Sequence, residues 1–231
     1  RQLTGRSQFV LMMDISNSMN AEDITPSRMA FSVAFAEKLL LGMEGSRVAL
    51  FAFAANGYLI MPFTSDLFAL RSVLAGLSPL ATTHQGTHIG ESLETLFKKL
   101  ASIERSVLDK GGDWMPPSLV MLSDGESHSP IEIKTLARFR SARIPIYAIG
   151  VGTPGGTLIP TGGRSNSMPL RDRSGKPIHT QLNKKNLTEM SSRTEGAYFS
   201  ARLEEIPRLI DHLKRRDRGG QSPSQFQTRS E

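Results

Sequence analysis

The stretch Phe9-Val10-Leu11-Met12-Met13-Asp14-Ile15-Ser16-Asn17-Ser18 begins as an apolar run and ends in three oxygen-bearing side chains, each two residues apart. A short, continuous apolar run is typical of a strand that is buried on both faces. Once the chain leaves the strand and turns, Asp14, Ser16 and Ser18 can converge on one point. One carboxylate and two hydroxyls are oxygen ligands of the kind that Mg²⁺ prefers. Taken alone, the pattern is equally an ordinary turn or helix cap.

Two further segments supply oxygen ligands of the same kind. Gly86-Thr87-His88-Ile89-Gly90 opens a helix-patterned stretch and places the Thr87 hydroxyl at its start. Residues 118–123 form a second apolar strand, and Asp124 follows it directly. In a doubly wound sheet, ligands bind beyond the carboxyl ends of the strands, where the strand order reverses. We therefore expect Asp14 and Asp124 to lie side by side, with Thr87 reaching in from the loop between.

Strand and helix patterns alternate along the chain. Strands are predicted at 9–13, 47–53, 57–62, 118–123, 145–150 and 196–200, and helices at about 26–42, 66–77, 88–105, 131–142, 184–194 and 203–215. Asn56-Gly57 is a hairpin signal, which makes the third strand antiparallel and places it at the edge of the sheet. The expected fold is α/β: a doubly wound, mainly parallel six-stranded sheet with one antiparallel edge strand and helices on both faces.

Length and composition agree with a single domain. A chain of 231 residues with 39% hydrophobic residues is long enough to bury a large core, and we place one domain at residues 1–215. Residues 153–182 are rich in Gly and Pro and contain the turn Asp172-Arg173-Ser174-Gly175, which predicts a hairpin-like insertion. Residues 216–231 are polar and are interpreted as a flexible tail.

The composition also excludes some classes of site. The chain has no cysteine, which rules out disulfides and thiolate metal sites and leaves the compartment open. No stretch approaches the roughly 18 consecutive apolar residues of a membrane span. Because the first residue is Arg, we expect the sequence to be a processed or excised piece, with any signal or membrane anchor outside it.

Basic residues gather in and just after the insertion. The chain has a formal net charge of +6, and one acid, Asp172, stands among six basic residues: Arg164, Arg171, Arg173, Lys176, Lys184 and Lys185. A solvated surface loop is one interpretation, and an acidic partner or an anionic lipid surface is the other. No aromatic residues are interleaved with these charges for base stacking, which argues against nucleic acid.

Together, the three separated motifs resemble the metal-ion-dependent adhesion site of von Willebrand factor A domains, and the resemblance extends over roughly residues 7–215. Residues 21–28, 59–66 and 149–154 are similar to the bacterial Bat (aerotolerance) group in particular. Asn17 stands where many A domains carry Gly, at a position expected to face away from the metal. The site residues that the resemblance implies, for Mg²⁺ or Mn²⁺, are Asp14, Ser16, Ser18, Thr87 and Asp124.

The resemblance implies a binding module rather than an enzyme. The ion would keep one open coordination position, to be filled by an Asp or Glu carboxylate of a partner protein. For the Bat group it implies a protein anchored in the bacterial inner membrane by segments outside this chain, with the domain facing the periplasm. The implied partners are a MoxR-type AAA+ ATPase and other Bat proteins.

An enzymatic alternative uses the same residues. Asp14 at the end of its strand could act as the nucleophile of a phosphatase-like hydrolase with Mg²⁺ beside it. That chemistry generally needs a second acid two residues further on, where this chain has Ser16, and no well-placed Lys lies near the motif. We therefore favour binding over hydrolysis.

Other patterns near the motifs carry less weight. Gly150-x-Gly152-x-x-Gly155 has the letters of a dinucleotide fingerprint, but a Pro/Gly-rich loop follows it instead of a helix. For His84 and His88 we expect loop and cap roles, because Gly86 lies between them and no H-E-x-x-H pattern is present. Glu91 and Glu126 could either orient the metal ligands or be exposed acids, and the sequence leaves both open.

Overall fold

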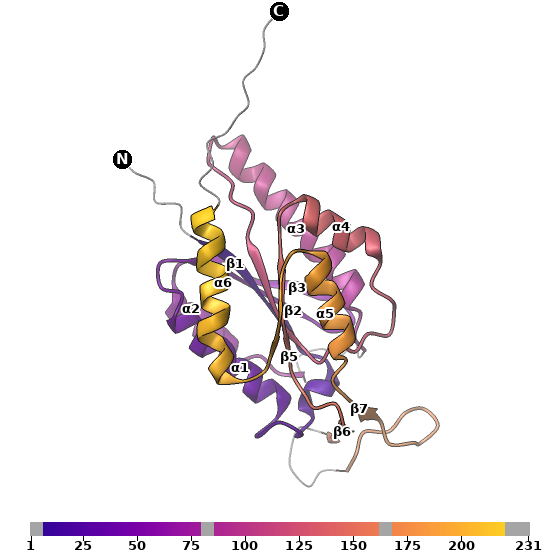
Figure 1. Ribbon diagram of the computed structural model, residues 1–231. Helices are drawn as coiled ribbons and strands as arrows, with labels where there is room; N and C mark the ends of the chain where they lie inside the picture. Colours follow the sequence, from indigo (N-terminus) through magenta and orange to yellow (C-terminus); the bar gives the residue numbers. More distant parts are fainter. Residues whose placement is uncertain (1–6, 80–85, 162–167, 220–231) are drawn as a thin grey trace, which may run out of the picture.

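A six-stranded sheet forms the centre of the molecule. The structure, a computed structural model, describes residues 7–79, 86–161 and 168–219 (Figure 1). The sheet has the order β3-β2-β1-β4-β5-β8, and only the β2–β3 pair is antiparallel. The strands are β1 (Gln8–Asp14), β2 (Arg47–Phe53), β3 (Gly57–Thr64), β4 (Ser118–Ser123), β5 (Ile146–Gly150) and β8 (Tyr198–Ser200). The predicted fold class is confirmed, including the antiparallel edge strand.

Helices cover both faces of the sheet (Figure 1). They are α1 (Arg28–Leu41), α2 (Leu67–Ala75), α3 (Ile89–Asp109), α4 (Ile133–Ser141), α5 (Lys184–Arg193) and α6 (Ile206–Gly219). Helices α1, α2 and α6 pack on one face, and α3, α4 and α5 pack on the other. Within the described ranges, no helix is both long and apolar enough to span a bilayer.

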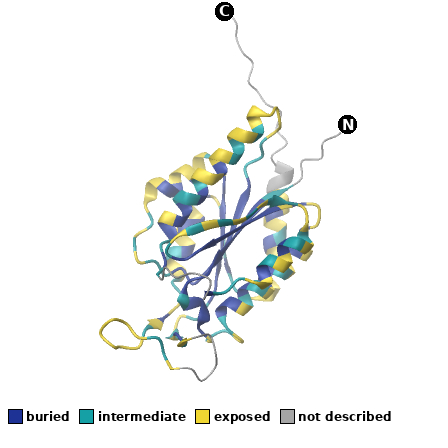
Figure 2. Cartoon of the chain, turned by 180° about the vertical axis from the view of Figure 1, so that it is seen from behind, coloured by how far each residue is buried: buried dark blue, intermediate teal, exposed yellow. Residues whose placement is uncertain are grey.

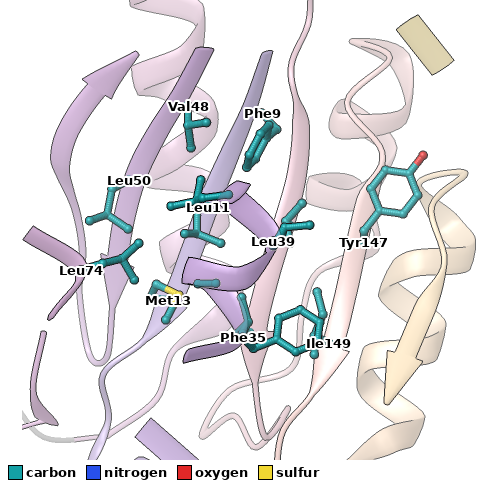
Figure 3. Packing of buried hydrophobic residues seen from close by; sticks show 14 of the residues in the cluster. Phe9, Leu11, Met13, Phe35, Leu39, Val48, Leu50, Leu74, Tyr147 and Ile149 are labelled. Carbon is teal, nitrogen blue, oxygen red and sulfur yellow. The ribbon is translucent and has the colours of Figure 1, made fainter. Parts of the chain in front are cut away.

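Each central strand is buried on both faces because its side chains alternate between two cores. Phe9, Leu11 and Met13 of β1 point into the core under α1, where Phe35 and Leu39 meet them (Figure 3). The alternate residues of β1 belong to the core under α3. β4 and β5 are buried along their whole length, whereas edge strand β3 largely alternates between half-buried and exposed residues (Figure 2). This burial explains why the central strands are continuous apolar runs.

The strand order reverses between β1 and β4. From β1 the chain crosses to β2 on one side, and from β4 it crosses to β5 on the other. The two strands pair in parallel, with Met13 opposite Leu122, so that the residues following each strand leave the sheet at the same edge. This is the place where doubly wound sheets bind ligands.

Several predicted boundaries shift for local reasons. α1 begins at Arg28 rather than 26, because Ser27 caps it by accepting a hydrogen bond from the backbone N–H of Ala30. Residues 203–205 form a 3₁₀ turn before α6, which starts at Ile206 with Pro207 in its first turn. α6 continues to Gly219, past residue 215 where the predicted helix ends, through basic residues that favour helix. Residues 220–231 lie outside the described part of the chain.

The segment after β5 contains a small second sheet. β6 (Thr157–Leu158) and β7 (His179–Thr180) pair antiparallel, and isolated bridges join Pro160 to Pro169 and Arg171 to Pro177. Figure 1 shows this hairpin beyond the lower end of β5, beside the loop into α1. The hairpin therefore lies at the edge of the sheet where Asp14 and Asp124 emerge.

Candidate metal centre

Two carboxylates mark the ends of the two central strands. Asp14 is the last residue of β1 and Asp124 directly follows β4, and both side chains are fully buried. Asp14 Oδ2 accepts a 2.6 Å hydrogen bond from the Ser123 hydroxyl, so the ends of β1 and β4 are in direct contact. Asp124 Oδ1 accepts a 2.9 Å bond from the backbone N–H of Glu126, which fixes the turn after β4.

Glycine makes that turn possible. Gly125 has a φ of +76°, a conformation that side-chain-bearing residues rarely adopt. A Cβ at this position would also lie 2.7 Å from the carbonyl oxygen of Asn183, the N-cap of α5. The Ser-Asp-Gly sequence is therefore needed both for the turn that presents Asp124 and for the close approach of α5.

Three hydroxyl residues surround the carboxylates. The backbone N–H of Ser16 donates to Asp14 Oδ1 at 2.9 Å, and the hydroxyl oxygens of Ser16 and Ser18 are 3.0 Å apart in the turn after β1. Thr87 directly precedes His88, the N-cap of α3, and its backbone N–H donates to His128 Nδ1 at 3.1 Å. All three are buried. The structure thus brings every residue of the predicted ligand set to one edge of the sheet.

Burial makes the two carboxylates difficult to ionise together. Burial, with the neighbouring charge of Asp14 as the next cause, raises the pKa of Asp124 to about 7. Burial also raises the pKa of Asp14, although hydrogen bonds from Ser123 and Ser16 and the charge of Arg28 oppose the rise. A cation placed between the two groups would relieve this repulsion.

The donor set fits a hard divalent cation. Two carboxylates and three hydroxyls are oxygen donors, which Mg²⁺ and Mn²⁺ prefer over nitrogen or sulfur. Within residues 7–79, 86–161 and 168–219, no group of three or more His, Cys, Asp or Glu side chains could hold a metal. Any cation at this edge of the sheet therefore depends on the hydroxyls of Ser16, Ser18 and Thr87 as well as on the two acids.

A buried arginine, which the sequence reasoning missed, completes the site. Arg28 is fully buried at the start of α1, and its Nη1 donates to Asp124 Oδ2 at 2.9 Å. Its Nε and Nη2 donate to the two carboxylate oxygens of Asp23 at 2.8 and 2.9 Å. These bonds hold the pKa of Asp23 below its usual range, although burial acts in the opposite direction. The guanidinium therefore fixes the orientation of Asp124 from the side of α1.

The loop after β5 packs directly on this arginine. Gly152 has a φ of +122°, and a Cβ there would lie 2.9 Å from the guanidinium carbon of Arg28. The next residue, Thr153, donates from its N–H and its hydroxyl to Asp23 Oδ2 at 2.8 and 2.9 Å. The glycines that resemble a dinucleotide fingerprint thus include one that serves to cover a buried ion pair.

Glu126 connects the site to the hairpin. Its carboxylate accepts a 2.5 Å bond from the Thr180 hydroxyl and a 3.3 Å bond from the N–H of Gln181. Arg28 Nη1 also donates to the Thr180 hydroxyl, at 2.9 Å. By contrast, Glu91 is exposed and lies 3.4 Å from His88 Nδ1. Of the two acids that the sequence left open, Glu126 supports the site.

The basic residues are divided between different surfaces. Arg171 is exposed beside the site, and its Nη1 donates to the carbonyl oxygen of Gly175. Arg173 and Lys176 are exposed in the hairpin turn, whereas Lys184 and Lys185 begin α5, where Lys184 lies over the ring of Tyr198. Arg164 and His84 lie outside the described residues. The cationic segment is therefore only partly directed at the candidate site.

Comparison with known proteins places this geometry in a family. Residues 9–126 match the von Willebrand factor type A domain. A UPF0353 protein of Mycolicibacterium paratuberculosis is 28% identical over 223 residues, which cover 91% of this chain and 60% of that protein. The chain thus spans about 60% of the length of such relatives.

Solved structures show the same fold. An aerotolerance-related membrane protein from Bacteroides fragilis, with multiple mutations to serines, is 28% identical with a TM-score of 0.75 and covers 92% of this chain and 99% of its own. BatB from Bacteroides thetaiotaomicron is 25% identical with a TM-score of 0.75, and the match covers 90% of this chain and 99% of the BatB chain.

A more distant likeness concerns the fold alone. Proximal thread matrix protein 1 of the mussel byssus, a protein with zinc in its MIDAS motif, is 14% identical with a TM-score of 0.56, covering 90% of this chain and 47% of its own. Because the family match covers slightly more than half of the 231 residues, the chain belongs to the von Willebrand factor type A domain family.

Proposed function

We propose that this domain is a metal-dependent protein-binding module. Asp14, Ser16, Ser18, Thr87 and Asp124 would hold one Mg²⁺ or Mn²⁺, and an Asp or Glu carboxylate of a partner protein would fill a remaining coordination position. The observation that supports this most is the meeting of two buried, mutually repelling carboxylates with three buried hydroxyls at the strand-order reversal. With the hydroxyls of Ser16, Ser18 and Thr87 as direct ligands and the two acids bound through water, the cation would stay electrophilic, which favours an added carboxylate.

The same geometry favours binding over hydrolysis. Both carboxylate oxygens of Asp14 accept hydrogen bonds, from the Ser16 N–H and the Ser123 hydroxyl, and the side chain is fully buried. A nucleophilic oxygen must be accessible to its substrate, and the Asp14 side chain has no exposed surface. The position of a second acid is taken by Ser16. Steady Mg²⁺-dependent hydrolysis of p-nitrophenyl phosphate that is lost in Asp14→Asn would overturn this choice in favour of a phosphatase-like hydrolase.

At the level of the whole protein, we propose that the domain belongs to a Bat-type complex at the bacterial inner membrane. The likeness to an aerotolerance-related membrane protein and to BatB supports this. The domain would face the periplasm and would bind other Bat proteins and a MoxR-type AAA+ ATPase as part of a stress-tolerance system.

Metal titration by calorimetry tests the core of the proposal. One site for Mg²⁺ or Mn²⁺ is expected in the natural chain and none in Asp14→Ala or Asp124→Ala. Asp113→Asn is the matched control, because Asp113 is exposed and precedes β4, at the opposite end of that strand from Asp124. Zn²⁺ belongs in the titration as well, since the mussel protein carries it. Metal binding that is unchanged in both site variants would refute the assignment.

A pull-down tests the partner class. The natural chain with Mg²⁺ should retain a Bat protein or a MoxR-type ATPase from a bacterial extract, and the Asp14→Ala chain should not. Excess EDTA should abolish retention, and the Asp113→Asn chain should behave like the natural one. Retention that persists in EDTA and in Asp14→Ala would show that the metal site takes no part in partner binding.

A further inference from the structure

A cavity of about 590 Å³ lies directly in front of the candidate metal site. One side is formed by the site itself, including Ser16, Ser18 and Thr87, and half-buried Asn17 lines the cavity between the two serines. The opposite side is formed by the hairpin after β5. The volume falls in the range of about 300 to 1,000 Å³ that small-ligand pockets occupy, so the cavity has room for more than one carboxylate group.

The hairpin side of the cavity is apolar. Ile159, Leu170 and Ile178 all line it. Their backbones are joined in a ring: Ile159 N–H donates to the Ile178 carbonyl at 3.1 Å, Ile178 N–H to Leu170 at 2.8 Å, and Leu170 N–H to Ile159 at 2.7 Å. Ile159 is buried, whereas Leu170 and Ile178 are half-buried and still offer surface. We refer to these three residues as the apolar wall.

The apolar wall is held in place by the same buried groups that orient Asp124. β7 ends at Thr180, which is buried and whose hydroxyl contacts Arg28 and Glu126. Two residues after β7, the N–H of Leu182 donates to the Thr153 carbonyl at 3.0 Å, and the N–H of Asn183 donates to the Asp124 carbonyl at 2.7 Å. These hydrogen bonds therefore fix the position of the apolar wall relative to the metal site.

The charge of the cavity suits an acidic occupant. Among its described lining residues the only acid is Glu126, and both oxygens of that carboxylate already accept hydrogen bonds from Thr180 and Gln181. Arg171 and His179 line the cavity from the hairpin and are exposed. The Arg171 guanidinium and the hydrogen-bonded Glu126 carboxylate thus border a space that has an apolar surface on one side and the oxygen ligands of the metal site on the other.

We infer that the cavity recognises an extended peptide segment of the partner in which an Asp or Glu and a large aliphatic residue lie two positions apart. The acid would go to the metal side and the aliphatic side chain to the apolar wall. In an extended chain, residues i and i+2 project from the same face about 7 Å apart. The cube root of the cavity volume, about 8 Å, is comparable with that separation. The inference rests on the proposed metal-dependent binding of a carboxylate.

Labelled peptides in a Gly/Ser background test the recognition on the unmodified chain by fluorescence anisotropy, with Mg²⁺ present. Asp-Ser-Leu and Leu-Ser-Asp cover the two directions, Asp-Ser-Ser lacks the aliphatic group, and Asn-Ser-Leu lacks the carboxylate. One of the first two should bind about 5- to 30-fold more tightly than Asp-Ser-Ser, because the leucine side chain leaves water at the wall. Asn-Ser-Leu should show no Mg²⁺-dependent binding.

Variants then locate the aliphatic contact. Leu170→Ala and Ile178→Ala should each remove most of the preference for leucine while leaving calorimetric Mg²⁺ affinity unchanged. Leu158→Ala and Met168→Ala are matched controls, because these aliphatic residues lie in the same hairpin, are 44% and 73% exposed, and do not line the cavity. Both controls should retain the preference of the natural chain.

The outcomes separate the two levels of the proposal. Equal Mg²⁺-dependent binding of Asp-Ser-Leu, Leu-Ser-Asp and Asp-Ser-Ser would overturn the inference and leave the proposed function standing. Hexanoate is a free carboxylate with an aliphatic tail. If it competed as strongly as the best peptide, the occupant would be a small acid, and the inference would again be overturned while the proposed function stood. Binding of every peptide that is indifferent to Mg²⁺ and to Asp14→Ala would overturn both.

Discussion

Replacing Asp124 with Asn should stabilise the metal-free protein at alkaline pH, although it removes a buried ion pair. Burial and the neighbouring Asp14 raise the pKa of Asp124 to about 7, from an ordinary value of 3.8. A difference of this size corresponds to on the order of 4 kcal/mol of unfavourable free energy for the ionised group in the folded protein. The attraction between Arg28 and Asp124 is already one of the causes that set this pKa, so the order of magnitude includes it.

The direction of the pH dependence follows from the raised pKa. The folded protein binds a proton at Asp124 more tightly than the unfolded chain does, so this group's contribution to stability is complete below about pH 4 and is lost as the pH rises through about 7. The amide that replaces the carboxylate in Asp124→Asn cannot ionise, so the variant does not suffer this loss. Saturating metal opposes this difference, because a cation at 1,000 times its Kd adds about 4.1 kcal/mol to the natural protein alone, which offsets the advantage of the variant.

Urea unfolding, with fluorescence of the single Trp114 as the signal, measures both effects. In excess EDTA, Asp124→Asn should be the more stable protein at about pH 8, and the difference should shrink towards about pH 5. With excess Mg²⁺ at about pH 8, the natural protein should gain stability and the variant should not. Asp113→Asn controls for the loss of an exposed charge. A variant that is less stable than the natural protein in EDTA at alkaline pH would refute the reasoning.

Three other variants test separate parts of the site. Arg28→Met should lower the free energy of unfolding by about 3 to 5 kcal/mol in urea titrations, because Asp23 and Asp124 lose their buried partner; a loss below about 1 kcal/mol would show that the ion pairs add little. Thr87→Ala should fold normally by circular dichroism but weaken metal-dependent peptide binding by roughly 1 to 3 kcal/mol, whereas unfolding with normal affinity per folded molecule would make Thr87 purely structural. Replacing Arg171, Arg173 and Lys176 with Ser should slow association with an acidic partner several-fold at low salt in stopped-flow measurements and have little effect near about 0.5 M salt; rates that ignore both changes would leave these charges as a solvated loop.

The fold was predictable because its central strands contain almost only apolar residues. β2 and β4 were placed at their observed limits, since residues 47–53 and 118–123 are bounded by turns and fill both cores. The ends of the helices were harder to predict. α3 runs to Asp109 because helix-favouring residues extend it past Leu100, its last buried residue, and α6 runs to Gly219 through a further series of polar residues. Hydrophobic periodicity marks where a helix is buried and gives no information on how far it extends into solvent.

The site was predictable only where its residues follow strands or open a helix. Asp14, Thr87 and Asp124 stand at such places, so the topology alone brings them together. Arg28 gave no such signal, because a basic residue in the first turn of a helix is ordinarily solvated. The available clue was its position between Ser27, a capping residue, and the largely apolar run 29–36, where a charge has little access to water. Its partner Asp124 lies 96 residues away, a separation at which sequence spacing carries no information.

Attraction for a partner and selection among partners have different physical sources at this site. A cation held by Asp14, Asp124 and the hydroxyls would attract any carboxylate, whereas the apolar wall can distinguish one acidic segment from another. The metal site and the apolar wall are connected through Thr180 and Arg28, which contact each other. The Thr180 hydroxyl lies 3.4 Å from Asp124 Oδ2, and Arg28 Nη1 lies 2.9 Å from the same oxygen. Removing Arg28 should therefore disturb metal affinity and peptide preference together, whereas Leu170→Ala should disturb only the preference. An Arg28 variant with normal metal affinity but no preference would mean that the guanidinium supports the hairpin alone.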